Sequence, residues 1–183
     1  MPRPRIYRDN AQKQAAYRQR LRKRQSVLFR HKSDEWETPP ALFAELDREF
    51  GFTTDVCALP HNARCAHFYS PGQDGLKQHW GGVCWMNPPY GLALRQWVKK
   101  AWDSAEQNGA TVVCLLPVRA DTTWWHDIVL PHAAEVRYIR GRLQFGGVGN
   151  SAPFASAVVV FRPATPPAEP RVVEPGSSQA LCS

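Results

Sequence analysis

The organisation of this chain follows from one seven-residue segment, Trp85-Met86-Asn87-Pro88-Pro89-Tyr90-Gly91. The segment continues the short apolar run 81–84, which predicts a buried strand. Pro88 and Pro89 lack backbone N–H donors and have a fixed φ, so the chain has to leave the sheet at this point. The sequence therefore predicts a strand that ends in a rigid turn.

This turn carries groups that suit a planar substrate with an exocyclic amino group. The side-chain carbonyl of Asn87 and the backbone carbonyl of Pro88 can point at one spot, with the ring of Tyr90 beside them. Two acceptors would take both amino hydrogens and orient the nitrogen lone pair toward an electrophile, while the ring would hold the base plane. The alternative is a proline-rich turn that only caps a strand.

Length and charge predict one domain with two tails. Residues 1–32 hold eleven Lys/Arg and one acidic residue, whereas the remainder holds twelve Lys/Arg and fifteen Asp/Glu. We expect a basic arm over 1–32, partly helical at 12–25, then a domain over 33–162 and a disordered tail over 163–183. The arm suits a polyanion such as DNA, or else it is a solubilising tail.

No apolar run reaches membrane-spanning length, and the N-terminus lacks the apolar core of a signal peptide, so we expect a cytoplasmic protein without a membrane partner. The five cysteines lie mostly in apolar surroundings, which predicts reduced thiols. The spacing of Cys57, His61, Cys65 and His67 fits none of the common zinc patterns, so we expect no metal.

Helical and extended patterns alternate along the rest of the domain. We expect helices over 39–50, 94–107 and from 124 onward, and strands over 52–58, 111–116, 134–139 and 154–161. Thr38 is the predicted N-cap of the first helix, and Gly51 its predicted end. The pattern predicts a mixed α/β fold with a mostly parallel sheet and a closing β-hairpin.

Several charged residues follow predicted strands. Asp55 ends the first strand, Asp74 lies in an Asp-Gly pair, and Arg119 and Asp121 follow the strand over 111–116. Open α/β sheets bind ligands at the carboxyl ends of their strands, so these residues are candidates for a site. Asp74 has an equally good alternative as an ordinary turn residue.

The order and spacing of several motifs resemble those of the phage-type DNA N6-adenine methyltransferases, the small Dam-like enzymes of phages and prophages. The motifs are Asp34-Glu35-Trp36-x-Thr38-Pro39, Asp55-Val-Cys-Ala58, Asn62, Asp74-Gly-Leu76, Asn87-Pro-Pro-Tyr-Gly91, Leu115-Leu-Pro-x-Arg119-x-Asp121-Thr122, Arg140-Gly-Arg-Leu-x-Phe145-Gly146 and Pro153-Phe154-x-Ser156-Ala157. They cover about residues 33–162.

The resemblance implies a class I, Rossmann-like methyltransferase fold, with S-adenosyl-L-methionine as cofactor and a flipped adenine in double-stranded DNA as methyl acceptor. It implies catalytic roles for Asn87, Pro88, Pro89 and Tyr90. It implies cofactor contacts in which Asp55 faces the methionine ammonium and Asp74 faces the adenine. The residues implied to contact the cofactor are Trp36, Thr38, Pro39, Asp55, Ala58, Asp74 and Asn87. It implies substrate contacts by Tyr90, Arg119, Asp121 and Arg142. No acidic residue clearly ends a second strand, so the contacts to the cofactor ribose have no assignment.

Two alternatives remain open. The same turn resembles that of methyltransferases acting on other amino groups, such as an RNA base, N4 of cytosine or a protein glutamine. A non-catalytic DNA-binding module is the second alternative. Methylation of cytosine C5 is excluded, because it needs a nucleophilic cysteine that usually follows a proline, and the sequence contains no Pro-Cys pair.

Overall fold

The computed structural model describes residues 14, 36–145 and 151–164. The predicted basic arm with its helix therefore lies outside the described residues, apart from Gln14, and so do the loop at 146–150 and residues 165–183 of the predicted tail. Within the described part, no helix is long and apolar enough to cross a membrane.

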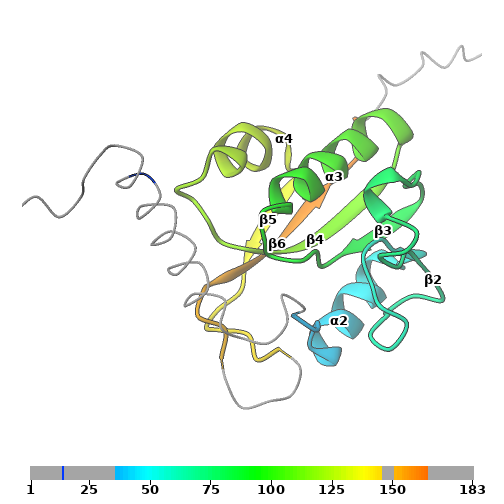
Figure 1. The fold of residues 1–183 in the computed structure, drawn as a ribbon, viewed down its shortest axis with the longest axis horizontal. Helices are drawn as coiled ribbons and strands as arrows, with labels where there is room; N and C mark the ends of the chain where they lie inside the picture. The colour runs from blue at the N-terminus through cyan, green and yellow to red at the C-terminus, as the bar shows by residue number, and fades with distance from the viewer. Residues whose placement is uncertain (1–13, 15–35, 146–150, 165–183) are drawn as a thin grey trace, which may run out of the picture.

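A six-stranded sheet forms the centre of the domain (Figure 1). Its strands are β1 (Thr54–Asp55), β2 (His67–Phe68), β3 (Val83–Met86), β4 (Thr111–Pro117), β5 (Glu135–Tyr138) and β6 (Ser156–Phe161), in the order β2-β1-β3-β4-β6-β5. The first four are parallel to one another, and β6 runs antiparallel to both β4 and β5. The predicted mostly parallel sheet with a closing hairpin is confirmed.

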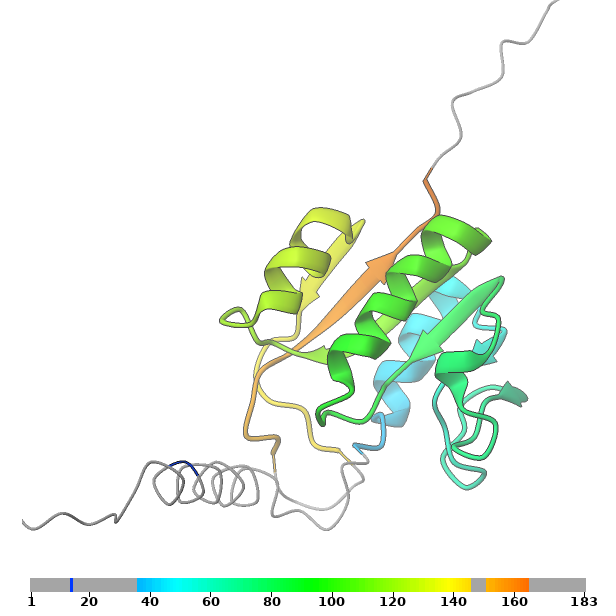
Figure 2. The same ribbon diagram turned by 45° about the horizontal axis from the view of Figure 1, so that its top comes forward.

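Helices cover both faces of this sheet (Figures 1 and 2). The helix α2 (Pro40–Phe50) lies on one face, and α3 (Leu94–Asn108) and α4 (Leu130–His132) lie on the other. Glycines in the left-handed region, Gly51 at φ 67° and Gly109 at φ 66°, end α2 and α3. Because β4 is covered on both sides, its side chains from Val112 to Pro117 are all buried.

The helix expected from residue 124 is irregular. A π-helical turn over Trp125–Val129 leads into the short α4. Trp124 and Trp125 are 6% and 1% exposed and belong to the core, as expected of large aromatic side chains at the foot of a helix. Their predicted packing role is confirmed.

Thr38 is not the N-cap that the sequence predicts. The helix begins at Pro40, with Pro39 at the N-cap position and no side-chain cap. Pro39 and Pro40 have no N–H groups, so a Thr38 hydroxyl would find few donors to satisfy at this end. Its Oγ1 instead accepts a hydrogen bond from Nδ2 of Asn87, at 3.0 Å.

The strand expected over 52–58 is short, because β1 contains only Thr54 and Asp55. The backbone hydrogen bonds from Thr53 to Val83 and from Val56 to Trp85 continue its pairing by one residue on each side. Beyond Val56 the chain turns, since the side chain of Asp55 accepts a hydrogen bond from the backbone N–H of Cys57. Because β1 ends early, the chain turns away from the sheet beside the carboxyl end of β3.

Candidate active site

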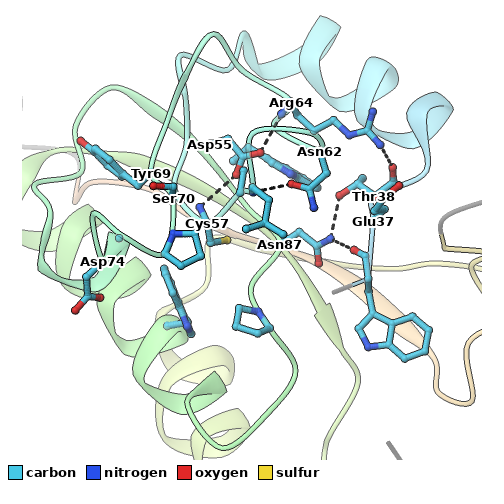
Figure 3. Close-up of a pocket in the computed structure, with 18 residues that line it drawn as sticks. Glu37, Thr38, Asp55, Cys57, Asn62, Arg64, Tyr69, Ser70, Asp74 and Asn87 are labelled. Carbon is cyan, nitrogen blue, oxygen red and sulfur yellow. Dashed lines mark hydrogen bonds between the residues drawn. The ribbon is translucent and has the colours of Figure 1, made fainter. Parts of the chain in front are cut away.

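A cavity of about 320 Å³ lies at the carboxyl ends of β1, β2 and β3 (Figure 3). Its size is in the range of about 300–1,000 Å³ that is usual for small-molecule sites. The strand ends supply Asp55, Ser70 and Asn87, and the segment before α2 supplies Trp36 and Thr38. Open α/β sheets bind ligands at this edge, so the cavity lies where the topology predicts a site.

Asp55 is the buried acidic group of the cavity, with 3% of its surface exposed. Its Oδ1 accepts from the N–H of Cys57 at 3.3 Å, and its Oδ2 accepts from the N–H of Arg64 at 3.1 Å. Burial raises the pKa of the Asp55 carboxyl, and these two hydrogen bonds oppose that shift. A cationic ligand group would supply the counter-charge that this side chain needs.

Asp74 lies at the opposite end of the cavity from Thr38 (Figure 3), and the next residue, Gly75, also lines the cavity. Asp74 has a left-handed φ of 54°, and its Oδ2 lies 2.9 Å from Nζ of Lys77. A Cβ on Gly75 would lie 2.2 Å from the carbonyl oxygen of Val56, so only glycine fits against this strand end. The indole N–H of Trp80 donates to the Gly75 carbonyl at 2.8 Å and fixes the turn as a wall.

The Asn87 amide is held at three points at the other end. Its Nδ2 donates to Oγ1 of Thr38 and to the carbonyl oxygen of Trp36. The Tyr90 hydroxyl lies 3.0 Å from Oδ1 of Asn87 and 3.2 Å from the carbonyl oxygen of Leu115. With both amide hydrogens engaged, Oδ1 has a fixed direction and keeps a lone pair for a further donor. Asn87 is thus a preorganised hydrogen-bond acceptor.

The ring of Tyr90 is covered in this structure. It is 1% exposed, and Trp36 lies nearly parallel to it with ring centroids 6.5 Å apart. Phe154 and Phe145 meet it edge-on at 5.4 and 6.4 Å. A base that stacks on Tyr90 therefore requires a movement of this aromatic cover, whereas the hydroxyl already orients Asn87.

The structure brings most of the predicted cofactor residues together. The cavity is lined by Trp36, Thr38, Asp55, Ala58, Asp74, Asn87 and Pro89. The residues expected at the site that do not line it are Pro39, Pro88, Tyr90, Arg119, Asp121 and Arg142. Arg142 donates from Nη1 to the carbonyl oxygen of Ala152 at 3.2 Å, and the substrate roles of Arg119, Asp121 and Arg142 stay predictions.

Other lining residues carried no predicted role in the sequence. Arg64, Tyr69 and Ser70 come from the connection between β1 and β2 and from the end of β2. Asn62 is part of the resembling motif set, and its Oδ1 accepts from the N–H of Leu59 at 2.7 Å. Periodicity gives no signal in so irregular a connection, and only the position after β2 marks Tyr69 and Ser70.

The four cysteines in the described ranges are free thiols. Burial raises the pKa of Cys84 to about 11 and that of Cys65 to about 12, so neither is an activated nucleophile. No group of three or more His, Cys, Asp or Glu side chains is placed to hold a metal ion in the same ranges. Nδ1 of His67 instead lies 3.1 Å from Oγ1 of Thr54.

The sheet is mostly parallel, with the antiparallel strand β6 between β4 and β5, and an Asn-Pro-Pro-Tyr turn lies beside a cavity at its carboxyl edge. These features are typical of the α/β fold of S-adenosylmethionine-dependent methyltransferases. The model of the family described as DNA N-6-adenine-methyltransferase (Dam) matches residues 25–168. The chain belongs to this family, which confirms the resemblance seen in the motifs.

Two curated relatives are similar to the chain. It is 38% identical over 109 residues to the DNA N-6-adenine-methyltransferase of Haemophilus phage HP1 (strain HP1c1), a match that covers 58% of this chain and 62% of the phage protein. It is 30% identical over 78 residues to the putative methyltransferase YfdM of Escherichia coli (strain K12), covering 38% of this chain and 86% of that protein.

Proposed function

We propose that the protein transfers a methyl group from S-adenosylmethionine to the N6 amino group of adenine in double-stranded DNA. One observation carries the proposal: the Asn87 amide is locked at the rim of the cavity with an acceptor oxygen still able to take a hydrogen bond. Such an acceptor orients an amino group by accepting a hydrogen bond from one of the amino hydrogens. The family and the phage relative support adenine as the base.

The residues of the cavity fit the proposed cofactor. Asp55 lies where an ammonium group would find a negative partner, and Asp74 at the far wall suits the amino group of an adenine. When bound, S-adenosylmethionine supplies an electrophilic methyl group. Asn87 has to hold the acceptor amino group at the same end of the cavity as Thr38, because the two side chains are joined by a hydrogen bond.

A labelling experiment tests the substrate. The protein is incubated with methyl-labelled S-adenosylmethionine and, separately, with unmethylated double-stranded DNA, RNA and a protein extract. We expect label in the DNA fraction. Label only in RNA or only in protein would contradict the proposal. A DNA substrate would also place the protein in the cytoplasm of the bacterial host if a phage or prophage encodes it.

The alternative of a non-catalytic DNA-binding module predicts DNA binding without cofactor binding. Calorimetry with S-adenosylmethionine separates the two. We expect a binding heat and a rise in the melting temperature, because a ligand that binds only the folded state stabilises it. The absence of both at millimolar cofactor would favour the binding module.

Replacing Tyr90 with phenylalanine keeps the packed ring and removes the hydroxyl that contacts Oδ1 of Asn87. The net free-energy contribution of one such hydrogen bond predicts a fall in turnover of about tenfold or less. The fall is limited because two hydrogen bonds still hold the Asn87 side chain. Cofactor affinity from calorimetry should not change. Unaltered turnover would show that the hydroxyl does not position Asn87.

Deleting residues 1–32 should leave the domain folded and able to bind the cofactor, since the cavity lies within residues 36–97. DNA affinity should fall, and the slope of log affinity against log salt should become shallower by about 0.9 for every phosphate that the arm neutralises. Base preference should persist, because phosphate contacts carry no sequence information. An unchanged salt slope would mean that this arm does not contact DNA.

A further inference from the structure

The side chains that line the cavity include more acidic than basic groups. Three of its lining side chains are acidic, namely Glu37, Asp55 and Asp74, and among the described residues that line it Arg64 is the single basic one. A ligand with two cationic groups and one carboxylate, such as S-adenosylmethionine, has charges that complement these acidic and basic side chains. The carboxylate has one candidate ionic partner in the cavity, which is Arg64.

Hydrogen bonds hold Arg64 beside this cavity at its backbone N–H and at its guanidinium. Its backbone N–H donates to Oδ2 of Asp55 at 3.1 Å, and its Nη2 donates to the carbonyl oxygen of Thr38. The side chain therefore extends from Asp55 to the Thr38 end, away from Asp74 (Figure 3). Within the described ranges no acidic side chain forms an ion pair with Arg64. Arg64 is half-buried, and a guanidinium with unused donors suits an anionic ligand.

The neighbouring charges of Asp55 and Arg64 favour one ligand chemistry. An α-amino acid carries its ammonium and its carboxylate on one carbon. Asp55 and Arg64 line the same cavity, and the positive charge of Arg64 is close enough to oppose the rise in the pKa of the Asp55 carboxyl. A DNA phosphate fits less well, because the buried carboxyl of Asp55 would repel it. The pair complements a zwitterion.

We propose that Arg64 binds the carboxylate of the methionine end of the cofactor and, through Thr38, links that binding to the position of Asn87. The inference rests on the proposed use of S-adenosylmethionine. The link is a chain of hydrogen bonds: Arg64 donates to the Thr38 carbonyl, and Asn87 donates to the Thr38 hydroxyl. The same guanidinium thus recognises the ligand and holds the segment that orients the acceptor.

The test compares three ligands by calorimetry in the absence of DNA. They are S-adenosylmethionine, its decarboxylated form, which lacks only the carboxylate, and 5′-deoxy-5′-methylthioadenosine, a neutral thioether that lacks the ammonium, the carboxylate and the sulfonium charge. The wild-type protein should prefer S-adenosylmethionine to the decarboxylated form by on the order of 10-fold to 100-fold, as charge-assisted hydrogen bonds of this kind predict. Failure of the wild-type protein to bind any of the three would contradict the proposed function itself.

Arg64→Met should abolish this preference and leave the affinity for methylthioadenosine unchanged. Arg64→Lys should retain a part of it, because lysine keeps the charge but lacks the planar fork of donors. Arg95→Met, which removes an exposed arginine of α3, is the matched control and should behave as the wild type.

Three results would overturn the role of Arg64 while the proposed function stands. The first is a wild-type protein that binds S-adenosylmethionine and its decarboxylated form equally well. The second is an Arg64→Met variant that keeps the preference. The third is an equal loss of affinity for all three ligands in Arg64→Met, which would give Arg64 a purely structural role.

Discussion

Replacing Asn87 with alanine should lower methyl transfer to DNA by on the order of 10²-fold or more, because it removes a preorganised polar contact to the reacting amino group. The substitution deletes the oxygen that lies next to the Tyr90 hydroxyl and the two hydrogen bonds to Trp36 and Thr38. Single-turnover rates with labelled cofactor measure the effect. Calorimetry should show that cofactor affinity changes little.

Asn87→Asp is the informative companion to this variant. Aspartate keeps an acceptor oxygen of the same size but cannot donate to the carbonyl oxygen of Trp36. We expect a turnover between those of the wild type and Asn87→Ala. An Asn87→Ala protein with near wild-type turnover would remove the Asn-Pro-Pro-Tyr turn from the mechanism.

Replacing Asp55 with alanine should weaken S-adenosylmethionine binding by about 10-fold to 150-fold, which corresponds to the roughly 1.5–3 kcal/mol of a charge-assisted hydrogen bond. Asp55 is buried and lines the cavity, so its charge acts through little intervening water. DNA binding, measured by fluorescence anisotropy, should not change. Asp127→Asn, at an exposed position, is a control for the loss of one negative charge.

The affinity of the wild-type protein should also depend on pH. Burial raises the pKa of Asp55, so on acidification its negative charge is lost at a higher pH than that of an exposed aspartate with a pKa of about 3.9. Cofactor affinity should fall as the pH drops through the raised pKa of Asp55, and the Asp55→Asn variant should lack this pH dependence. Unchanged affinity in a folded Asp55 variant would leave it only the role of turning the chain after β1.

The elements with strong local signals could be predicted from the sequence. The buried run at 111–116 is β4, and the apolar stripe from Leu94 is α3, ending at Gly109 as its left-handed glycine indicates. The prolines after Asn87 end β3, since neither can donate to a neighbouring strand. In each case the pattern that sets the structure lies within the element or in the residues that directly follow it.

The contacts that build the site come from distant segments, and the sequence pattern does not encode them. Asn87 is tied to Trp36 and Thr38, which lie 51 and 49 positions away. Trp36, Phe145 and Phe154 cover Tyr90, so the ring that the sequence predicts to stack on a base is buried in this structure. The sequence predicts Thr38 as the cap of α2, because capping is a local rule, whereas the hydrogen bond that Thr38 accepts comes from the distant Asn87.

Identifying the methylated base tests the proposed transfer to adenine most directly. Unmethylated DNA is incubated with S-adenosylmethionine and either the wild-type protein or Asn87→Ala, digested to nucleosides and analysed by mass spectrometry. We expect N6-methyladenine with the wild type and on the order of a hundredfold less with Asn87→Ala at equal times, because the variant lacks one preorganised acceptor for the amino group. N4-methylcytosine as the product, or no methylated base from a protein that binds the cofactor, would contradict the proposal.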